Sequence, residues 1–294
     1  MAHIERLGPW ALTHAKALNL QVLRLEWVRD YFPGYTDLQV KIEIDSKIFE
    51  GRGSDLNKDI AFAKGLTEAI ERYVCFSNGV TSLGVAGHYD FENAKENAYF
   101  EFIERSFLNF HYKNKAPMKK ISSKALNINV SGHDNTFPFK MYHFQMSVGG
   151  GLFAVFSLAE GLSCSPQFGG IMGASVSSDL ASAITKASIE CMRNVAALGL
   201  YRIEPLSHQD FQRINSPSSE DSRRLLFSPE YCRNLLNIFS SDFNSEIEPL
   251  DFKFDQMIFK ELSYSHPLLK DCPLKFVQCL DSSGSRAPDI EFVG

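Results

Sequence analysis

The sequence has no long hydrophobic run and no secretion signal. Its 294 residues include no stretch of about 18 consecutive apolar residues, so we expect no transmembrane helix. Residues 1–6 lack the basic start and the apolar core of a secretion signal. These absences predict a cytoplasmic protein with no membrane partner, and a content of 44% hydrophobic and 22% charged residues is typical of a globular chain.

Cysteine pairs and basic blocks are also absent. The six cysteines stand singly among apolar neighbours and form no Cys-x-x-Cys pair. This pattern is typical of buried thiols in a reducing compartment and does not indicate a zinc site. The formal net charge of −5 is spread along the chain without a basic block, so no nucleic-acid partner is expected.

The motifs of several enzyme classes are missing. No Gly-x-x-x-x-Gly-Lys-Ser/Thr occurs, and no Gly-x-Gly-x-x-Gly opens a helix after a strand, so neither a P-loop nor a dinucleotide fold is predicted. No Ser-His-Asp or Cys-His set is apparent, and no catalytic residue is assigned. Four histidines are interpreted as loop or structural residues: His88, His111, His133 and His143.

What the sequence does contain is a repeated Glu-x-x-Glu-Arg pentapeptide. Residues 68–72 (Glu-Ala-Ile-Glu-Arg) return thirty-three positions later as residues 101–105 (Glu-Phe-Ile-Glu-Arg), both times inside an apolar stretch. Two carboxylates at positions i and i+3 of a helix share one face. A helix that is apolar nearly all round is a buried helix, and buried carboxylates need partners.

These carboxylates suggest a magnesium site. Arg72 and Arg105 can balance only part of the negative charge, and a hard cation would balance the rest. Oxygen ligands favour Mg²⁺, which proteins commonly share between one or two carboxylates and substrate phosphates, so a nucleoside triphosphate is the expected ligand. The alternative is that the pairs are exposed and only form salt bridges with neighbouring basic residues. Four acids belong to the predicted site: Glu68, Glu71, Glu101 and Glu104.

Residue patterns also predict the elements that carry these acids. Alternating apolar and polar residues predict a strand over residues 38–49, which the segment 51–55 ends. Ser54 or Asp55 is then expected to cap a helix over residues 58–77. The second Glu-x-x-Glu pair lies on an expected helix from residue 91 to about residue 111.

The second half of the chain mixes strands and helices. We expect a hairpin of strands 138–148 and 151–162, a glycine-rich loop at 164–175 and a helix at 178–200. A further helix at 229–239 and strands at 256–262 and 274–280 follow. Because the elements do not alternate strictly as β-α-β, the sequence predicts an α+β fold. We expect a single domain over residues 1–294, with an exposed insertion at residues 205–230.

Three blocks of the sequence resemble the YcaO superfamily of ATP-dependent peptide-modifying enzymes. They lie in the family's order and cover about residues 50–195: residues 63–73 with 81–87, residues 101–105, and residues 173–175 with 183–190. The resemblance implies a YcaO-like fold of layered mixed sheets, whose buried helices carry a site for ATP and Mg²⁺. It adds Glu190 to the four metal ligands and places Arg72 or Arg105 near the nucleotide.

The resemblance also implies a reaction and its partners. Family members phosphorylate the oxygen of a peptide backbone amide after a nucleophile has added to the amide carbon. Loss of phosphate gives an azoline, which is the expected product, or alternatively a thioamide or an amidine. The substrate would be a precursor peptide in ribosomal peptide natural product maturation. Because the chain shows no attached leader-peptide-binding domain, we expect a separate leader-peptide-binding partner; a homo-oligomer is also possible.

The sequence departs from the family at several positions. Lys64 stands where the family usually has Ser, Arg193 where it usually has Gln, and Ser106 where it commonly has Asp. The two added cations could replace one metal or change how the nucleotide binds, so both are candidate nucleotide-binding residues. They also raise the alternative of a catalytically silent, peptide-binding subunit. A third hypothesis is an enzyme with a small-molecule substrate. The absence of a proline-rich C-terminal tail weakens the azoline assignment in favour of a thioamide or an amidine.

Overall fold

The computed structural model divides the chain into two compact units. Unit 1 comprises residues 1–103 and 254–287, and unit 2 comprises residues 104–253 and 288–294. That the whole chain folds as one domain stays a prediction. The structure describes these residues: 2–26, 32–114, 118–129, 136–148, 151–161, 169–201, 204–215, 218, 221, 224–225, 227–240 and 253–285.

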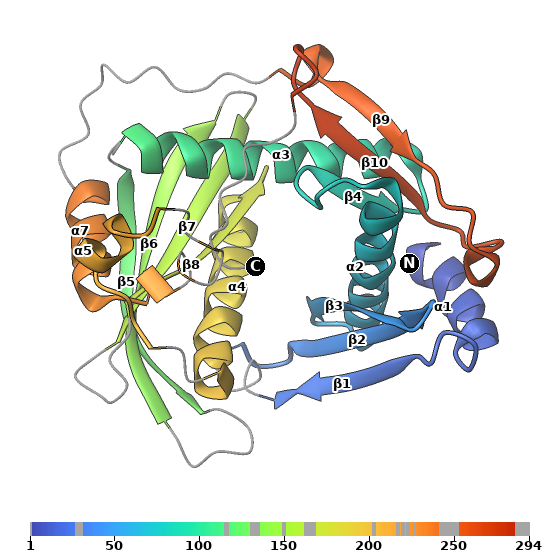
Figure 1. Cartoon of the computed structure of the whole chain (residues 1–294), viewed down its shortest axis with the longest axis horizontal. Coiled ribbons are helices and arrows are strands. Elements are labelled where there is room, and N and C mark those ends of the chain that lie inside the picture. Colours follow the sequence, from blue (N-terminus) through green and yellow to red (C-terminus); the bar gives the residue numbers. More distant parts are fainter. Residues whose placement is uncertain are drawn as a thin grey trace. The chain divides into compact units, whose positions relative to one another are not determined.

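Unit 1 is built on an antiparallel sheet with the strand order β1-β2-β3. Its strands are β1 (Gln21–Leu25), β2 (Thr36–Ile44) and β3 (Lys47–Asp55). Helix α2 (Lys58–Asn78) packs on β2 and β3 (Figure 1). Alternate residues of β2, including Val40, Ile42 and Ile44, are buried in a core that also contains Leu7 and Trp10 of α1 (Ala2–His14).

The predicted strand 38–49 is in fact a hairpin. Asp45 and Ser46 adopt left-handed backbone conformations, with φ of 51° and 61°, and the chain reverses there. The predicted end of the strand at 51–55 was therefore wrong, because these residues form most of β3. The alternation of apolar and polar residues breaks at the polar run Asp45–Lys47, and Asp and Ser favour turns, so the sequence does carry a signal for the reversal.

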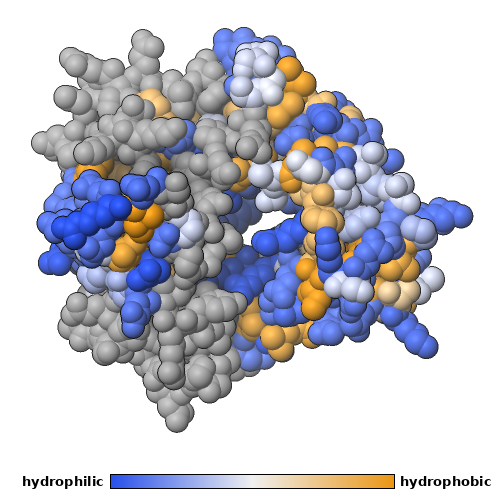
Figure 2. Space-filling model, in the orientation of Figure 1, coloured by the Kyte–Doolittle hydropathy of each residue, from blue (hydrophilic) through white to orange (hydrophobic). Residues whose placement is uncertain are grey.

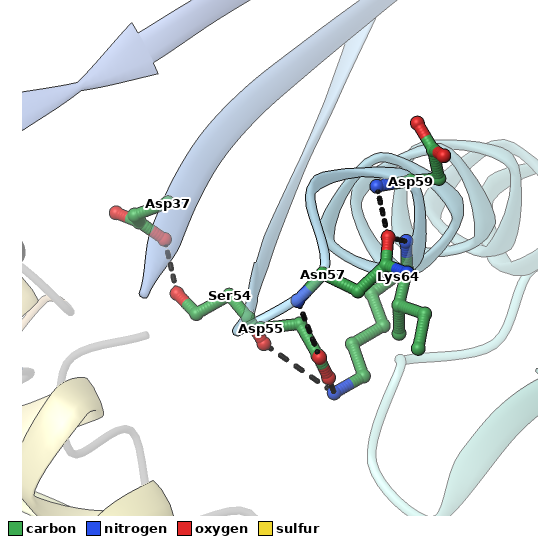
Figure 3. A network of polar contacts seen from close by, with 7 residues as sticks. Asp37, Ser54, Asp55, Asn57, Asp59 and Lys64 are labelled. Carbon is green, nitrogen blue, oxygen red and sulfur yellow. Dashed lines mark hydrogen bonds and ion pairs between the residues drawn. The ribbon is translucent and has the colours of Figure 1, made fainter. Parts of the chain in front are cut away.

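The predicted cap of α2 was also wrong by two to three residues. Asn57, not Ser54 or Asp55, precedes the helix, and its side chain accepts a hydrogen bond from the backbone N–H of Asp59 at 2.8 Å (Figure 3). Ser54 and Asp55 are still part of β3, which extends further than the sequence indicates.

A second sheet of unit 1 joins segments that are far apart in the sequence. Strand β4 (Val85–His88) and strand β9 (Ile258–Leu262) both pair antiparallel with β10 (Lys275–Leu280). Short 3₁₀ helices at Phe254–Gln256 and Pro267–Leu269 lie on either side of β9 in the sequence. Helix α3 (Phe91–Asn114) begins in unit 1 and continues into unit 2.

Unit 2 is an antiparallel sheet with helices on both faces. Its strands follow in the order β5 (Lys119–Asn129), β6 (Thr136–Val148), β7 (Leu152–Gly161) and β8 (Gly169–Ser177). Helix α4 (Leu180–Tyr201) covers one face, and α7 (Pro229–Phe239) covers the other (Figure 1). The ring of Phe239 contacts those of Phe144 and Phe156.

The predicted hairpin 138–148 and 151–162 is confirmed, since Val148 pairs with Leu152. The predicted glycine-rich loop was wrong over residues 169–175, which belong to β8, while residues 162–168 lie outside the described residues. The described part of the predicted insertion 205–230 contains the short helix α5 (His208–Gln212). That it is an insertion stays a prediction.

The exposed large apolar side chains come from different elements, among them Leu12 of α1, Ile48 of β3 and Phe76 of α2. Over unit 1, Figure 2 shows small apolar patches interspersed with hydrophilic residues. Within the described ranges, none of the helices combines the length and the apolar character that crossing a membrane requires.

Candidate functional site

Helix α2 lies unusually close to the sheet that supports it. A Cβ atom at Gly51 would collide with the backbone of Gly65 and Ala69, and one at Gly53 with the backbone of Ala61. Glycine at these two positions of β3 therefore allows the helix and the strand to pack backbone against backbone. This contact brings the side chains of α2 within reach of the strand's N–H groups.

Glu68 is held by that strand. Its Oε2 accepts a hydrogen bond from the backbone N–H of Arg52 at 2.8 Å, and its Oε1 accepts one from the guanidinium of Arg72 at 3.0 Å. Arg72 itself is half exposed. Both carboxylate oxygens of Glu68 thus accept hydrogen bonds, and the side chain has a fixed orientation.

Glu71, one turn further along α2, is in a different electrostatic environment. Burial raises the pKa of its carboxyl group well above the usual value, and the negative charges of Glu68 and Glu101 raise it further. The positive charge of Arg72 and a hydrogen bond from the backbone N–H of Gly87 lower it, but they do not compensate. Burial first, and then the charges of Glu68 and Glu101, therefore oppose ionisation of Glu71 more strongly than its favourable neighbours support it.

A bound cation would support the ionised form of Glu71. Carboxylate oxygens are the ligands that Mg²⁺ prefers, and a divalent ion would favour the ionised form of Glu71. In the described ranges, however, no three Asp, Glu, His or Cys side chains are grouped closely enough to hold a metal ion as they stand. That Glu68, Glu71 and Glu101 bind Mg²⁺ stays a prediction.

The second Glu-x-x-Glu-Arg segment lies on α3 as expected. Glu101, Glu104 and Arg105 are each partly buried, and the adjacent apolar residues Phe102 and Ile103 are fully buried. All three charged residues take part in polar or electrostatic interactions. This segment is therefore not a freely exposed helix face, and the alternative that its acids only form salt bridges with neighbouring basic residues stays open.

Lys64, the first departure from the family pattern, contacts the connection between β3 and α2. Its Nζ lies 2.7 Å from Oδ2 of Asp55 and 3.3 Å from the carbonyl oxygen of Ser54 (Figure 3). Burial works to raise the pKa of Asp55, but hydrogen bonds from Lys64 and from the backbone hold it below its usual value. The charge of Lys64 thus has a carboxylate partner, and its contact with a nucleotide stays a prediction.

In unit 2, helix α4 carries Glu190 and Arg193. Oε2 of Glu190 accepts a hydrogen bond from the backbone N–H of Ala174 in β8 at 2.9 Å. Arg193 is partly buried, and the amide of Asn194 donates a hydrogen bond to the carbonyl oxygen of Met172 at 2.9 Å. Like Glu68, Glu190 is held in place by a backbone N–H of the supporting strand.

One polar network of unit 2 was missed at the sequence level. The buried imidazole of His143 lies between two hydroxyls, with Nδ1 at 2.6 Å from Ser122 Oγ and Nε2 at 2.8 Å from Ser188 Oγ. Because the Ser188 hydroxyl donates to the carbonyl oxygen of Ile184, Nε2–H donates to Ser188 and Nδ1 accepts from Ser122.

This network joins β5, β6 and α4. Burial lowers the pKa of His143, which favours the neutral ring that the hydrogen bonds require. The interpretation of His143 as a structural residue agrees with this arrangement. No sequence signal could have indicated it, because its members come from three separate elements.

Comparisons with known proteins identify the fold. No protein-family model and no curated protein matches the sequence. Among solved structures, the chain is similar to YcaO from Methanopyrus kandleri bound with AMPPCP and Mg²⁺, with a TM-score of 0.60 and 11% identity over 98% of this chain and 94% of that chain. It is also similar to a heterocyclase in complex with substrate and cofactor, with a TM-score of 0.54 and 10% identity over 93% of this chain and 52% of that chain.

The chain therefore has the YcaO fold. This confirms both the predicted resemblance and the α+β fold class. At such low identity the similarity establishes the fold alone.

Proposed function

We propose that this chain is an ATP- and magnesium-dependent enzyme that modifies a backbone amide of a peptide. The observation that carries the proposal is the arrangement on α2: the N–H of Arg52 orients Glu68 at 2.8 Å, and Glu71 lies one turn further along, with a pKa raised by burial and by the charges of Glu68 and Glu101. Perturbed pKa values of this kind are common at functional sites. The YcaO fold supports the same conclusion, since one structure with this fold binds AMPPCP and Mg²⁺ and another binds a substrate and a cofactor.

In this proposal, the acids of unit 1 hold Mg²⁺ and thereby hold the triphosphate of ATP. Bound Mg²⁺ neutralises charge on the phosphoryl group that is transferred, so the protein contributes positioning and electrostatics. Glu68 is oriented by the N–H of Arg52, and Glu71 supplies the carboxylate that most needs a cation. Six further residues are proposed to contribute to the metal or nucleotide site: Arg72, Arg105, Lys64, Arg193, Glu104 and Glu190.

The proposed reaction begins within the substrate peptide. A side-chain nucleophile of the peptide adds to the carbon of a backbone amide, and the resulting oxyanion takes the γ-phosphoryl group of ATP, with release of ADP. Inorganic phosphate then leaves with the former amide oxygen, which gives an azoline. An external sulfur nucleophile would give a thioamide, and an amine would give an amidine.

None of these routes requires a nucleophile from the protein. The substrate is a precursor peptide, and we propose that a leader-peptide-binding partner protein delivers it. Azoline formation is the first choice, and a thioamide or an amidine is the alternative.

Nucleotide binding by the full chain tests the proposal. We expect isothermal titration calorimetry to show AMPPCP binding that depends on Mg²⁺. Glu71→Gln should weaken this binding on the order of tenfold, which corresponds to about 1.4 kcal/mol. Glu92→Gln is a matched control, because Glu92 is a largely exposed residue of α3 that pairs with Lys95 at 2.8 Å, and it should bind like the wild type.

Absence of AMPPCP binding in the presence of Mg²⁺ would contradict an enzyme and favour the silent, peptide-binding subunit. If binding is present, mass spectrometry of candidate precursor peptides incubated with ATP distinguishes the products. Loss of one water indicates an azoline, or an amidine formed with an amine of the same peptide, and replacement of oxygen by sulfur indicates a thioamide. A modified small molecule would support the third hypothesis.

A further inference from the structure

The two elements that present Glu68 and Glu190 share a sequence pattern. Each is a strand followed by a helix, β3 with α2 and β8 with α4, and each strand pairs antiparallel with the strand before it. The spacing from Gly51 to Glu68 equals that from Gly173 to Glu190. Between these residues, helix-capping, small and basic residues recur at the same relative positions. The matched pairs are Asn57 with Asp179, Ala61 with Ala183, and Lys64 with Lys186.

The same positions make the same backbone contacts. A Cβ atom at Gly51 would collide with the backbone oxygen of Gly65 and the nitrogen of Ala69. One at Gly173 would collide with the backbone oxygen of Ala187 and the nitrogen of Cys191, which are the matched positions of α4. In both elements the residue after the glycine donates its N–H to the carboxylate of the helix, at 2.8 Å for Glu68 and 2.9 Å for Glu190.

The two helices also begin in the same way. Asn57 accepts a hydrogen bond from the N–H of Ile60 at 3.4 Å, and Asp179 accepts one from the matched N–H of Ser182 at 2.7 Å. In each case the side chain of the capping residue satisfies an N–H group that has no partner within the helix. Two segments far apart in the sequence thus agree in strand pairing, cap, close packing and carboxylate contact.

They differ one turn after the shared glutamate. Helix α2 has Glu71 there, a carboxylate whose pKa is raised, whereas α4 has Arg193. Positions i and i+3 share a helix face, so the side chain next to Glu190 is a cation where that next to Glu68 is an acid. The second element therefore presents one carboxylate and one guanidinium instead of two carboxylates.

We infer that β3–α2 and β8–α4 are two copies of one ligand-presenting element, in which Glu190 corresponds to Glu68 and Arg193, in the place of Glu71, binds the phosphates directly. This inference rests on the proposed function, because it assigns Arg193 to the binding of nucleotide phosphates. A guanidinium carries a permanent positive charge and matches phosphate geometry with two parallel hydrogen bonds.

Titration of the full chain with AMPPCP, in Mg²⁺ and in EDTA, tests this assignment. We expect weak binding of the wild type in EDTA. Because an ionised hydrogen bond is lost, Arg193→Gln should weaken AMPPCP binding about tenfold or more under both conditions. Glu71→Gln should weaken binding only in Mg²⁺. Arg193→Glu gives the second copy a glutamate at the position of Glu71. AMPPCP binding by this variant should disappear in EDTA and should depend more steeply on Mg²⁺ than binding by the wild type.

Two controls separate the role of Arg193 from a general effect. Arg213→Gln removes an exposed arginine of unit 2, paired with Asp210 at 3.3 Å, and should bind like the wild type. Arg193→Lys keeps the charge and should retain binding in EDTA, which covers the case in which Arg193→Gln does not fold. If the wild type and all Arg193 variants bind equally in Mg²⁺, the inference is wrong and the proposed function stands. If the wild type does not bind in Mg²⁺, both are wrong.

Discussion

Helices α2 and α4 have the same relation to their supporting strands but carry different charges. The backbone of each helix packs against a glycine of its strand, and a glutamate of each helix accepts a hydrogen bond from the N–H of the residue after that glycine. One turn later, α2 continues with Glu71 and Arg72, and α4 with Arg193 and Asn194. The comparison indicates which features the element requires. The strand glycine and the glutamate bound to the strand recur in both elements, whereas the residues one turn later, which are proposed to bind the ligand, differ.

The glycines should give the largest effects, because they set the backbone contact that both elements share. We expect Gly51→Ala and Gly173→Ala each to lower the free energy of unfolding by about 3 kcal/mol or more, since the new Cβ meets backbone atoms that cannot rotate away. Urea unfolding followed by circular dichroism measures the change.

Gly8 in α1 provides the control for this comparison. Apart from its chain neighbours, a Cβ there meets nothing within 4 Å, so Gly8→Ala should change the free energy of unfolding by no more than about 1 kcal/mol, because the helix preference of Ala is opposed by crowding against Pro9. If only one of the two strand glycines tolerates alanine, the two elements are not equivalent in packing and the comparison between them fails.

The helices of this fold could largely be predicted from the sequence, and the contacts between strands and helices could not. The burial of α2 and α3 follows from apolar residues around both Glu-x-x-Glu pairs, and the family resemblance indicated the fold. Gly173 was interpreted as part of a loop, because glycine is unfavourable in strands. A glycine is needed at this position of β8 because the backbone of α4 packs directly against it, and this tertiary contact cannot be read from the local sequence.

The candidate site shows the same division. Spacing predicted that Glu68 and Glu71 share a helix face, and the two residues do lie one turn apart on α2. The donors that orient Glu68 and Glu190 are backbone N–H groups of Arg52 and Ala174. Every residue except proline has such a group, so residue identity cannot reveal which ones are used.

The second prediction concerns the charge difference between Glu71 and Arg193. Because the pKa of Glu71 in the folded state lies above its ordinary value of 4.5, the folded state binds this proton more tightly than the unfolded state. The resulting stability is fully present below pH 4.5 and is lost as the pH rises through the raised pKa. Without Mg²⁺, we therefore expect this contribution to the free energy of unfolding to be lost as the pH increases, which lowers the melting temperature of the wild type.

Glu71→Gln should remove this pH dependence, since the amide does not ionise, and should melt at a higher temperature than the wild type at neutral pH in EDTA. Added Mg²⁺ should narrow the difference by stabilising the wild type. Arg193→Gln serves as the comparison from the other element and should leave this pH dependence in place. If the melting temperatures of the wild type and of Glu71→Gln change with pH in parallel, the pKa of Glu71 is not raised by its surroundings.

The smallest effect is expected at the matched lysines. Lys64 pairs with Asp55, but their side chains are 47% and 25% exposed, and ion pairs with such access to water contribute about 0.2–1 kcal/mol. A double-mutant cycle of Lys64→Gln and Asp55→Asn, followed by urea unfolding, should give a coupling energy in that range. At the matched position of the second element, Ser177 replaces Asp55, so the cycle of Lys186→Gln and Ser177→Ala should give a smaller coupling. Equal coupling in both cycles would mean that the lysine position itself, and not the ion pair, contributes the stability.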